Sequence, residues 1–279
     1  MTFIVTYINA KRVFKKVLVY KEVFQISIPK IIHYCWFGKN PYPELTKKCI
    51  NSWKKYCPDY EIIEWNEDNF NVNCNQYTKE AYDAKKWAFV TDYVRLFALY
   101  NYGGIYLDTD LELIKPIDSF LTYPAFSGFE NEYMIPTAIM GSEKGNDWIK
   151  SLLKHYDNEH FVSKDGSLNL TTNVEIITKI TKNLYDIELN NTFQMVDGKF
   201  ALFPNYYFCP KEYFSEKITI TEQTYAIHHF SSSWKNVKEL KKHRHRVMYR
   251  KVFGKFGDVS LQFMSALKRE IRQIFARKR

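Results

Sequence analysis

Two aspartates that stand two residues apart, Asp108 and Asp110, follow a glycine pair and a short apolar stretch. On an extended strand, side chains at positions i and i+2 point to the same face, so we expect both carboxylates on one side and Thr109 on the other. Two negative charges this close are costly unless a cation lies between them, and oxygen ligands suit Mg²⁺ or Mn²⁺. The pair is therefore a candidate cation site. The alternative is an exposed turn at a strand end, where Asp is common.

A second pair of charged residues precedes this motif, on a helix predicted over residues 81–102. Asp92 and Arg95 are i, i+3 neighbours, and the residues around them, such as Phe89 and Val94, are apolar. We therefore expect this helix to be mostly buried, where charged groups need partners. The pair is either a surface ion pair of little energetic weight or part of a site that continues into the Asp108 region.

These residues need a scaffold, and the pattern of residues 29–65 predicts its type. A strand over 29–38, a helix over 44–56 and a strand over 60–65 form a βαβ unit, which predicts an α/β fold with a mostly parallel central sheet flanked by helices. Trp36 lies at the carboxyl end of the first strand, where ligands bind in open α/β sheets, and is either a core residue or a plate for a flat ring. Gly103 is expected to cap the helix over 81–102 in the αL conformation. Further strands are predicted over 126–130, 136–141 and 224–230, helices over 147–156 and 172–184, and short strands or loops over 200–204 and 206–210.

The composition fits a globular protein of one large α/β domain or two small ones, with 279 residues, 46% of them hydrophobic and 25% charged. The five cysteines are an odd number without a Cys-x-x-Cys pair, which favours free thiols in a reducing cytoplasm over a disulfide framework. No apolar run approaches the ~20 residues that span a bilayer, and the N-terminus lacks the features of a signal peptide. We therefore expect a cytoplasmic protein.

The positive charge is concentrated at the C-terminus. Residues 235–279 contain 15 Lys and Arg against 3 Asp and Glu, a net +12 within a total of +9, so residues 1–234 carry −3. Apolar residues alternate with the basic ones over 236–279, which is typical of a basic amphipathic helix on an anionic membrane surface. A solvated or dimerising helix is the alternative. The slightly acidic body and the lack of an RNA-binding motif argue against a nucleic-acid partner.

Four motifs in order carry a family resemblance: HYCWFG at 33–38, TDYVR at 91–95, GGIYLDTD at 103–110 and HHFSSSW at 228–234. Together they resemble glycosyltransferase family 32, the capsular polysaccharide and lipopolysaccharide type with a DXD motif. More distantly, they are similar to the glucosylating domains of large clostridial toxins. The resemblance covers about residues 28–234. It implies a GT-A fold, a nucleotide-sugar donor, Mn²⁺ or Mg²⁺, and retention of the anomeric configuration.

The resemblance also implies roles for single residues on the donor side. Trp36 matches the aromatic residue that stacks on the nucleotide base, commonly uracil. Asp92 matches a catalytic-site carboxylate that holds ribose or donor-sugar hydroxyls. Arg95 matches the cation that contacts the donor and the leaving diphosphate. Asp108 matches the first DXD carboxylate, which binds ribose and the metal, and Tyr106 lies near the donor phosphate in the distant toxins.

The remaining roles concern the metal and a closing flap. Asp110 matches the direct metal ligand, and His228 or His229 matches a late ligand of the metal or the diphosphate, with His228 favoured. Ser233 and Trp234 match a flap over the diphosphate, although three serines precede the Trp where the pattern often has a glycine.

The sequence thus predicts a metal-dependent retaining glycosyltransferase that moves a sugar, from a UDP-sugar in the first instance, to a saccharide or lipid-linked acceptor in surface polysaccharide synthesis. Front-face attack, with the departing phosphate oxygen taking the acceptor proton, is the expected route, and Glu112 is a candidate helper. We expect an N-terminal helical or extended segment over 1–27, a GT-A domain over 28–235 and a basic helical tail over 236–279, with the inner face of the membrane as the tail's candidate contact. The rival functions are a nucleic-acid or membrane-binding module that uses the tail, and an Asp-x-Asp phosphatase.

Overall fold

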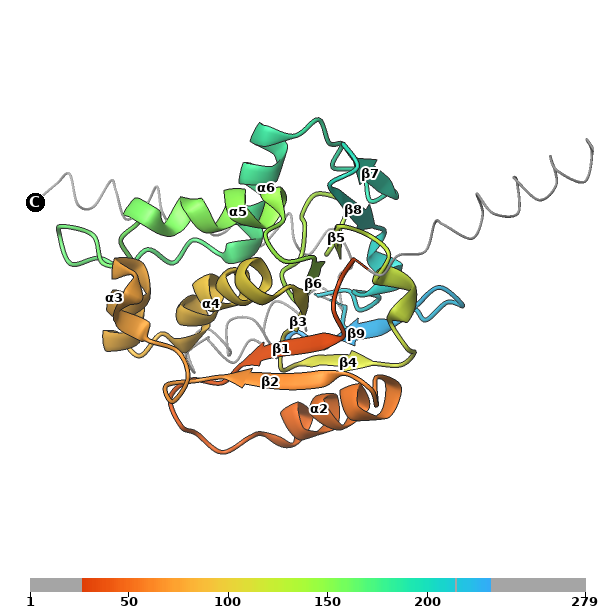
Figure 1. Cartoon of the computed structure of the whole chain (residues 1–279), viewed down its shortest axis with the longest axis horizontal. Helices are drawn as coiled ribbons and strands as arrows, with labels where there is room; N and C mark the ends of the chain where they lie inside the picture. The colour runs from red at the N-terminus through yellow and green to blue at the C-terminus, as the bar shows by residue number, and fades with distance from the viewer. Residues whose placement is uncertain (1–26, 214, 232–279) are drawn as a thin grey trace, which may run out of the picture.

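The computed structural model describes residues 27–213 and 215–231 (Figure 1). Apart from residue 27, the N-terminal segment over 1–27 lies outside this part of the chain, and so does the whole basic tail over 236–279. Within the described ranges, no helix combines the length and the apolar character that crossing a membrane requires. All five cysteines are free thiols, and four of them are buried.

The scaffold is a seven-stranded sheet with the order β2-β1-β3-β6-β5-β8-β7. The strand β1 lies between β2 and β3 and pairs with both in parallel, which confirms the predicted βαβ unit. A separate two-stranded sheet pairs β4 with β9. The bounds are β1 Ile31–Cys35, β2 Glu61–Trp65, β3 Gly104–Leu107, β4 Leu111–Leu113, β5 Ala125–Gly128, β6 Ile139–Ser142, β7 Gln194–Val196, β8 Phe200–Phe203 and β9 Ala226–His228.

The central sheet is mixed, so the prediction of a mostly parallel sheet is wrong. The strand β6 runs antiparallel to β3 and β5, and β7 runs antiparallel to β8, whereas β5 and β8 are parallel. The reason is the connection between β5 and β6. It contains no helix that could return the chain to the starting edge, and a direct return gives an antiparallel pair.

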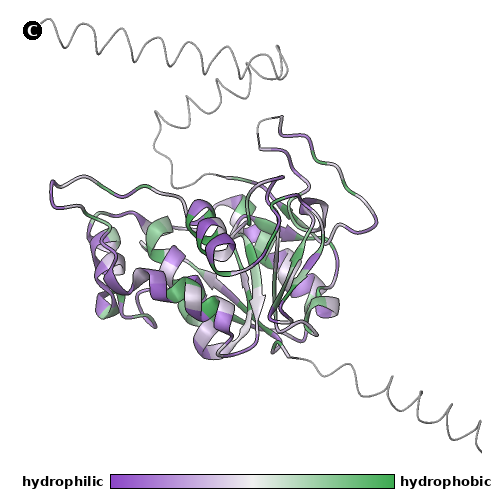
Figure 2. Cartoon of the chain, turned by 90° about the horizontal axis from the view of Figure 1, so that it is seen from above, coloured by the Kyte–Doolittle hydropathy of each residue, from purple (hydrophilic) through white to green (hydrophobic). Residues whose placement is uncertain are grey.

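Helices cover both faces of the sheet. The helix α4 contacts β1 and β3, and α5 and α6 continue the layer on its side, whereas α2 lies beyond β2 on the other side (Figure 1). Hydrophilic and hydrophobic residues share these helices, as expected for elements that pack one face against a core (Figure 2). The helices are α2 Glu44–Tyr56, α3 Gln76–Asp83, α4 Trp87–Tyr102, α5 Asp147–Lys154 and α6 Asn173–Leu184, with 3₁₀ turns η1 Val72–Cys74, η2 Asp118–Phe120, η3 His155–Asn158 and η4 Asn205–Tyr207.

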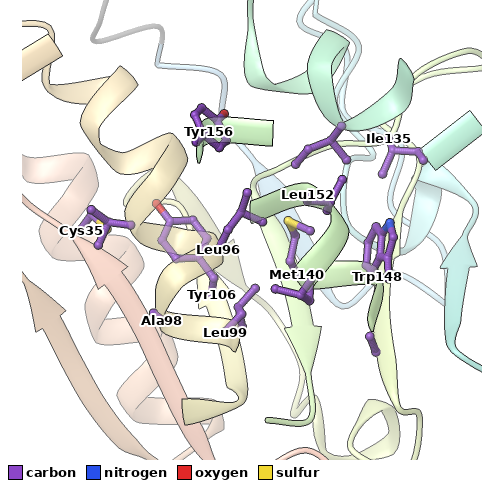
Figure 3. Packing of buried hydrophobic residues seen from close by; sticks show 14 of the residues in the cluster. Cys35, Leu96, Ala98, Leu99, Tyr106, Ile135, Met140, Trp148, Leu152 and Tyr156 are labelled. Atoms are coloured by element: carbon purple, nitrogen blue, oxygen red, sulfur yellow. The ribbon is translucent and has the colours of Figure 1, made fainter. Parts of the chain in front are cut away.

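The central strand β3 contributes to two hydrophobic clusters, one on each face. Ile105 and Leu107 belong to the cluster that contains α2, and Tyr106 belongs to the cluster that contains α4. This alternation is the period of two that an extended strand imposes. Figure 3 shows Cys35 and Tyr106 in the α4 cluster. Because every residue of β3 is buried, the strand fixes where the DXD motif begins.

The helix predicted over 81–102 is two helices, α3 and α4. Between them Lys85 has a φ of 56°, a conformation that interrupts a helix. Neither Gly nor Pro marks this break, and the ring of Trp87 packs against Tyr82 across it. Gly103 follows α4 with φ 70° and ψ −173°, so its φ is positive as expected but its ψ is extended and not αL. The segment 206–210, predicted as a strand or a loop, overlaps the 3₁₀ turn η4, and the edge strand β7 is an addition to the predicted elements.

Candidate functional site

The DXD residues lie in a tight turn between β3 and β4, and not on the continuous strand that we predicted. The strand ends at Leu107, and the Leu111 N–H donates to the carbonyl of Asp108 at 2.9 Å. The Asp108 N–H donates to the Ala138 carbonyl at 2.8 Å, which ties the turn to β6. The side chains of Asp108 and Asp110 are only 23% and 14% exposed, so the turn is not the exposed one of the alternative interpretation.

Asp110 is held by the segment that ends β9. The strands β4 and β9 pair with Leu111 opposite His228, which places the His228 Nε2 atom 3.3 Å from Oδ1 of Asp110. The Ser231 N–H donates to Oδ2 of the same carboxylate at 2.7 Å, and the His229 N–H donates to its backbone carbonyl at 3.0 Å. Burial acts to raise the pKa of Asp110, but His228 and the Ser231 donor outweigh it and hold this pKa well below its usual range.

The donor atoms of Asp108, Asp110 and His228 suit a divalent cation. One ligand atom from each lies within 4.8 Å of the others. Two carboxylate oxygens and an imidazole nitrogen form a ligand set that Mn²⁺ or Mg²⁺ accepts, with further positions left for phosphate oxygens and water. The Nδ1 atom of His228 is buried and has no hydrogen-bond partner among the described residues, whereas its Nε2 atom faces Asp110. The chemistry of this group fits the predicted metal.

Arg95 joins the two carboxylates that the sequence predicted at separate places. Its side chain is 5% exposed, with Nη2 at 3.1 Å from Oδ1 of Asp92 and Nη1 at 3.3 Å from Oδ1 of Asp108. The Nη1 atom also donates to the carbonyl of Thr137 at 2.7 Å. The guanidinium lies 4.6 Å from the centre of the Tyr106 ring, whose hydroxyl donates to Oδ1 of Asp108 at 3.0 Å. The helix α4, the strand β3 and the DXD turn therefore meet at the buried guanidinium of Arg95.

Asp92 is the least solvated of these carboxylates. Burial raises its pKa to about 7, Arg95 opposes the rise, and the nearby charge of Asp108 adds to it. Burial likewise raises the pKa of Asp108, against the opposing effect of Arg95. The carboxylates around Arg95 carry more negative charge than this one side chain neutralises, so the site suits a further cation.

The structure separates the two candidate histidines. His228 faces Asp110, whereas the His229 Nε2 atom lies 2.8 Å from Oε2 of Glu112, which also accepts from Lys48 at 2.7 Å. Burial acts to raise the pKa of Glu112, but Lys48 and His229 outweigh it and lower this pKa. Lowering its pKa makes a carboxylate a weaker base, and the role of Glu112 as a helper stays a prediction.

Trp36 lies apart from this group. It follows β1 directly, is partly buried, and donates its indole N–H to the carbonyl of Asn40 at 2.7 Å. Its ring contacts Tyr42. In the ranges that the structure describes, no hydrogen bond or ring contact links Trp36 to Asp108, Asp110 or His228. The predicted flap residues Ser233 and Trp234 lie outside these ranges.

One residue of the site was missed by sequence reasoning. Glu130 follows β5 and is partly buried; burial is the main cause of the rise in its pKa, which the charge of His228 opposes and that of Asp108 reinforces. The available signal was a single acidic residue at the end of the mostly apolar stretch 125–129.

Comparison with known proteins agrees with this geometry. Residues 43–127 match the family described as "Glycosyltransferase sugar-binding region containing DXD motif". The chain is 32% identical over 141 residues to "Inositol phosphoceramide mannosyltransferase 3" of Schizosaccharomyces pombe, covering 46% of this chain and 37% of that protein. It is 30% identical over 152 residues to "Mannosyl phosphorylinositol ceramide synthase SUR1" of Saccharomyces cerevisiae, covering 48% and 37%. The chain thus spans less than half the length of these relatives.

Among solved structures, the PaToxG glycosyltransferase aligns with a TM-score of 0.44 and 20% identity over 63% of this chain and 77% of that one. A glycosyltransferase involved in glycosylation of the major capsid of PBCV-1 aligns with a TM-score of 0.43 and 14% identity over 78% and 99%. The matched family region contains Asp92, Arg95, Asp108 and Asp110. Residues 43–127 therefore resemble the sugar-binding region of DXD glycosyltransferases, with Asp108 and Asp110 at the DXD positions, which confirms the predicted resemblance.

Proposed function

We propose that the chain is a metal-dependent glycosyltransferase that transfers a sugar from a nucleotide donor to a lipid-linked acceptor, on a fold of the GT-A type. The observation that carries the proposal is the convergence of Asp108, Asp110 and His228 within 4.8 Å, beside the buried Arg95. Two of the three members of this group lie inside the matched sugar-binding region.

The reaction breaks the bond between the sugar C1 atom and a diphosphate oxygen. Negative charge accumulates on the leaving group, and a cation held by Asp108, Asp110 and His228 would neutralise it as a Lewis acid. Arg95 supplies a fixed positive charge beside that group, and its contacts with Asp92 and Asp108 hold it in one position, so that little reorganisation is needed during the reaction.

The residues around this charge suit substrate binding. The carboxylate of Asp92 is an acceptor for sugar or ribose hydroxyls, and the ring of Trp36 offers a surface for a flat base. Binding energy at the base is remote from the reacting atom and contributes to positioning it. In the retaining route that we propose, the acceptor oxygen forms its bond to C1 on the face from which the phosphate departs, and the departing phosphate oxygen takes the acceptor proton.

The names of the relatives guide the choice of sugar and acceptor. They describe mannosyl transfer onto an inositol phosphoceramide, so we place mannose first among the donor sugars and a lipid-linked acceptor ahead of a free saccharide. A UDP-sugar and a surface-polysaccharide acceptor are the competing candidates. The basic tail over 236–279 would bring a cytoplasmic enzyme to an anionic membrane surface, where such an acceptor resides.

The main test is turnover of a donor panel of GDP-mannose, UDP-sugars and CMP-sugars, with and without Mn²⁺, in the wild type and in Asp110→Ala. We expect metal-dependent release of nucleotide from one donor and its loss in the variant. Asp165→Ala, which changes an exposed aspartate in a loop, is the matched control and should behave as the wild type. If the wild type neither turns over nor binds any of these donors with Mn²⁺ present, the proposed glycosyltransferase activity is ruled out.

The membrane contact needs a separate test. The full chain should sediment with vesicles that contain anionic lipid, and a chain that lacks residues 240–279 should not. A full chain that stays in the supernatant contradicts the membrane contact, without bearing on catalysis. Steep salt-dependent binding of the tail to DNA or RNA would favour the nucleic-acid alternative.

A further inference from the structure

The loop over residues 36–42 after β1 is folded tightly around the Trp36 indole. Gly38 and Lys39 have φ values of 89° and 54°, and this double positive-φ turn brings the Asn40 carbonyl to the indole N–H at 2.7 Å. The polar edge of the indole is therefore satisfied within the loop. What the partly buried ring has left to offer a ligand is its aromatic face.

Glu67, which follows β2, fixes the first half of this loop. Its Oε1 atom accepts the Gly38 N–H at 2.7 Å and the hydroxyl of Tyr82 at 3.2 Å. The Trp87 ring lies so close to Gly38 that a β-carbon there would be 2.5 Å from its Nε1 atom. The loop thus has little freedom at the point where it leaves the strand.

Glu64, in β2, fixes the other half through Tyr42. Its Oε2 atom accepts the hydroxyl of Tyr42 and, at 2.7 Å, that of Tyr34. Its Oε1 atom accepts from the side-chain amide of Asn66 at 2.9 Å. Three donors on one carboxylate favour its charged form, and although burial acts to raise the pKa of Glu64, these bonds lower it. A Tyr hydroxyl held by a charged acceptor gives its ring a defined position.

The anchored Tyr42 ring packs against Trp36. The ring centres are 4.9 Å apart with an angle of 70° between the planes, an edge-to-face arrangement. In this geometry one ring meets the other with its edge, so Tyr42 covers at most one face of Trp36. The pair lies at the carboxyl end of β1, next to the parallel strands β2 and β3, where an open α/β sheet binds its ligand.

We propose that Tyr42, anchored by Glu64, is a positioning residue that holds the Trp36 ring in the orientation in which it stacks on the nucleobase of the donor. The inference rests on the proposed function, because it needs a nucleotide donor. The physical basis is preorganisation: a ring that is already fixed loses less conformational freedom when the base binds. Tyr42 acts only through Trp36, so its effect belongs to the base end of the donor and not to the diphosphate end.

The test measures binding of three probes to the full chain with Mn²⁺ present, by calorimetry: UDP, GDP and inorganic pyrophosphate, which has no base. Tyr42→Leu should weaken the better-bound nucleoside diphosphate about tenfold, since stacking of a base on an aromatic side chain has roughly that effect. Its affinity for pyrophosphate should stay within about twofold of the wild type. Tyr42→Phe keeps the ring but loses the anchor to Glu64, and an intermediate loss is expected. Tyr206→Leu, at a partly buried tyrosine in η4, is the matched control for folding.

A double-mutant cycle separates positioning from a general loss of structure. In a Trp36→Leu chain there is no ring left to position, so adding Tyr42→Leu should leave nucleoside diphosphate affinity unchanged. Equal losses for pyrophosphate and nucleoside diphosphate, or full additivity with Trp36→Leu, would overturn the inference while the proposed function stands. A wild type that binds neither UDP nor GDP would overturn both.

Discussion

The Nε2 atom of His228 lies 3.3 Å from Oδ1 of Asp110, whereas that of the next residue, His229, lies 2.8 Å from Oε2 of Glu112. Successive side chains along an extended backbone point to opposite sides, which separates the two histidines, and Asp110 lies in the turn before β4 and not on the strand with Glu112. The two histidines, which the sequence alone left as alternatives, therefore have different neighbours.

This difference predicts different effects of the same substitution at the two positions. We expect His228→Gln to weaken Mn²⁺ binding by tenfold or more, because it removes an imidazole ligand, and His229→Gln to change it less than about threefold. The measurement is Mn²⁺ affinity of the chain from the EPR signal of the free ion, which does not depend on turnover. Equal losses in the two variants would contradict the assignment of His228 as the ligand.

Arg95 should matter for folding as well as for donor binding. Arg95→Met leaves the buried Asp92 and Asp108 without their cation, and we expect it to lower the free energy of unfolding by about 3–5 kcal/mol. The matched control is Lys48→Met, which breaks the bond to Glu112 at a lysine whose side chain is 59% exposed and should cost less than about 1 kcal/mol. Urea denaturation without added metal measures both. A loss for Arg95→Met as small as that of the control would show that the buried pair contributes little to stability.

His33 predicts a pH dependence of stability. Its Nδ1 atom accepts the indole N–H of Trp65 at 3.1 Å, so Nε2 carries the proton and donates to the Gly103 carbonyl at 2.7 Å, which fixes a neutral ring. Burial lowers the pKa of His33 to about 4, against an ordinary value of 6.5. Between these values the unfolded chain binds a proton that the folded chain does not, so this contribution is complete above pH 6.5 and is lost as the pH falls towards 4.

The lost stability should amount to about 3 kcal/mol, since one pKa unit corresponds to about 1.4 kcal/mol. Unfolding free energies of the wild type and of His33→Gln, measured from pH 7 down to pH 4, isolate this effect from other titrating groups. We expect the difference between the two proteins to shrink as the pH falls. Parallel curves would contradict a neutral buried His33.

The sequence predicted those strands, helices and helix ends that depend on residues close together in the chain. The strands around Ile32 and Ile62, the helix that follows Pro43 and the end of α4 at Gly103 all have apolar periodicity or a Gly or Pro boundary. The break at Lys85 has no such signal, because contacts of Trp87 with residues before the break stabilise it. The antiparallel half of the sheet was missed for a similar reason, since strand direction depends on how distant segments pair.

The same distinction applies to the site. The spacing of Asp92 and Arg95 on a helix was sufficient to place them together. The strand predicted before Asp108 is β3, so the position of Asp108 at its end was also predictable. The turn that follows reversed the expectation of a continuous strand, yet Asp110 reached the same cluster through its contacts with β9. Glu130 depends wholly on the position of the loop after β5, and residue types alone do not determine that position.

The second glycine before the DXD motif should be more sensitive than its φ alone suggests. Gly104 has a φ of 106°, and a β-carbon there would lie 2.7 Å from the backbone carbonyl oxygen of Ile31, in the paired strand β1. Gly145 has a φ of 78°, but apart from its chain neighbours no atom of residues 27–213 and 215–231 lies within 4 Å of the same position. We expect Gly145→Ala to cost about 1 kcal/mol of unfolding free energy, for the positive φ, and Gly104→Ala about 3 kcal/mol, because the strands must also move apart.

Since β3 leads directly into Asp108, Gly104→Ala should also weaken Mn²⁺ binding, whereas Gly145→Ala should not. Equal stability losses in the two variants would show that the close approach of β1 and β3 places no constraint on the motif.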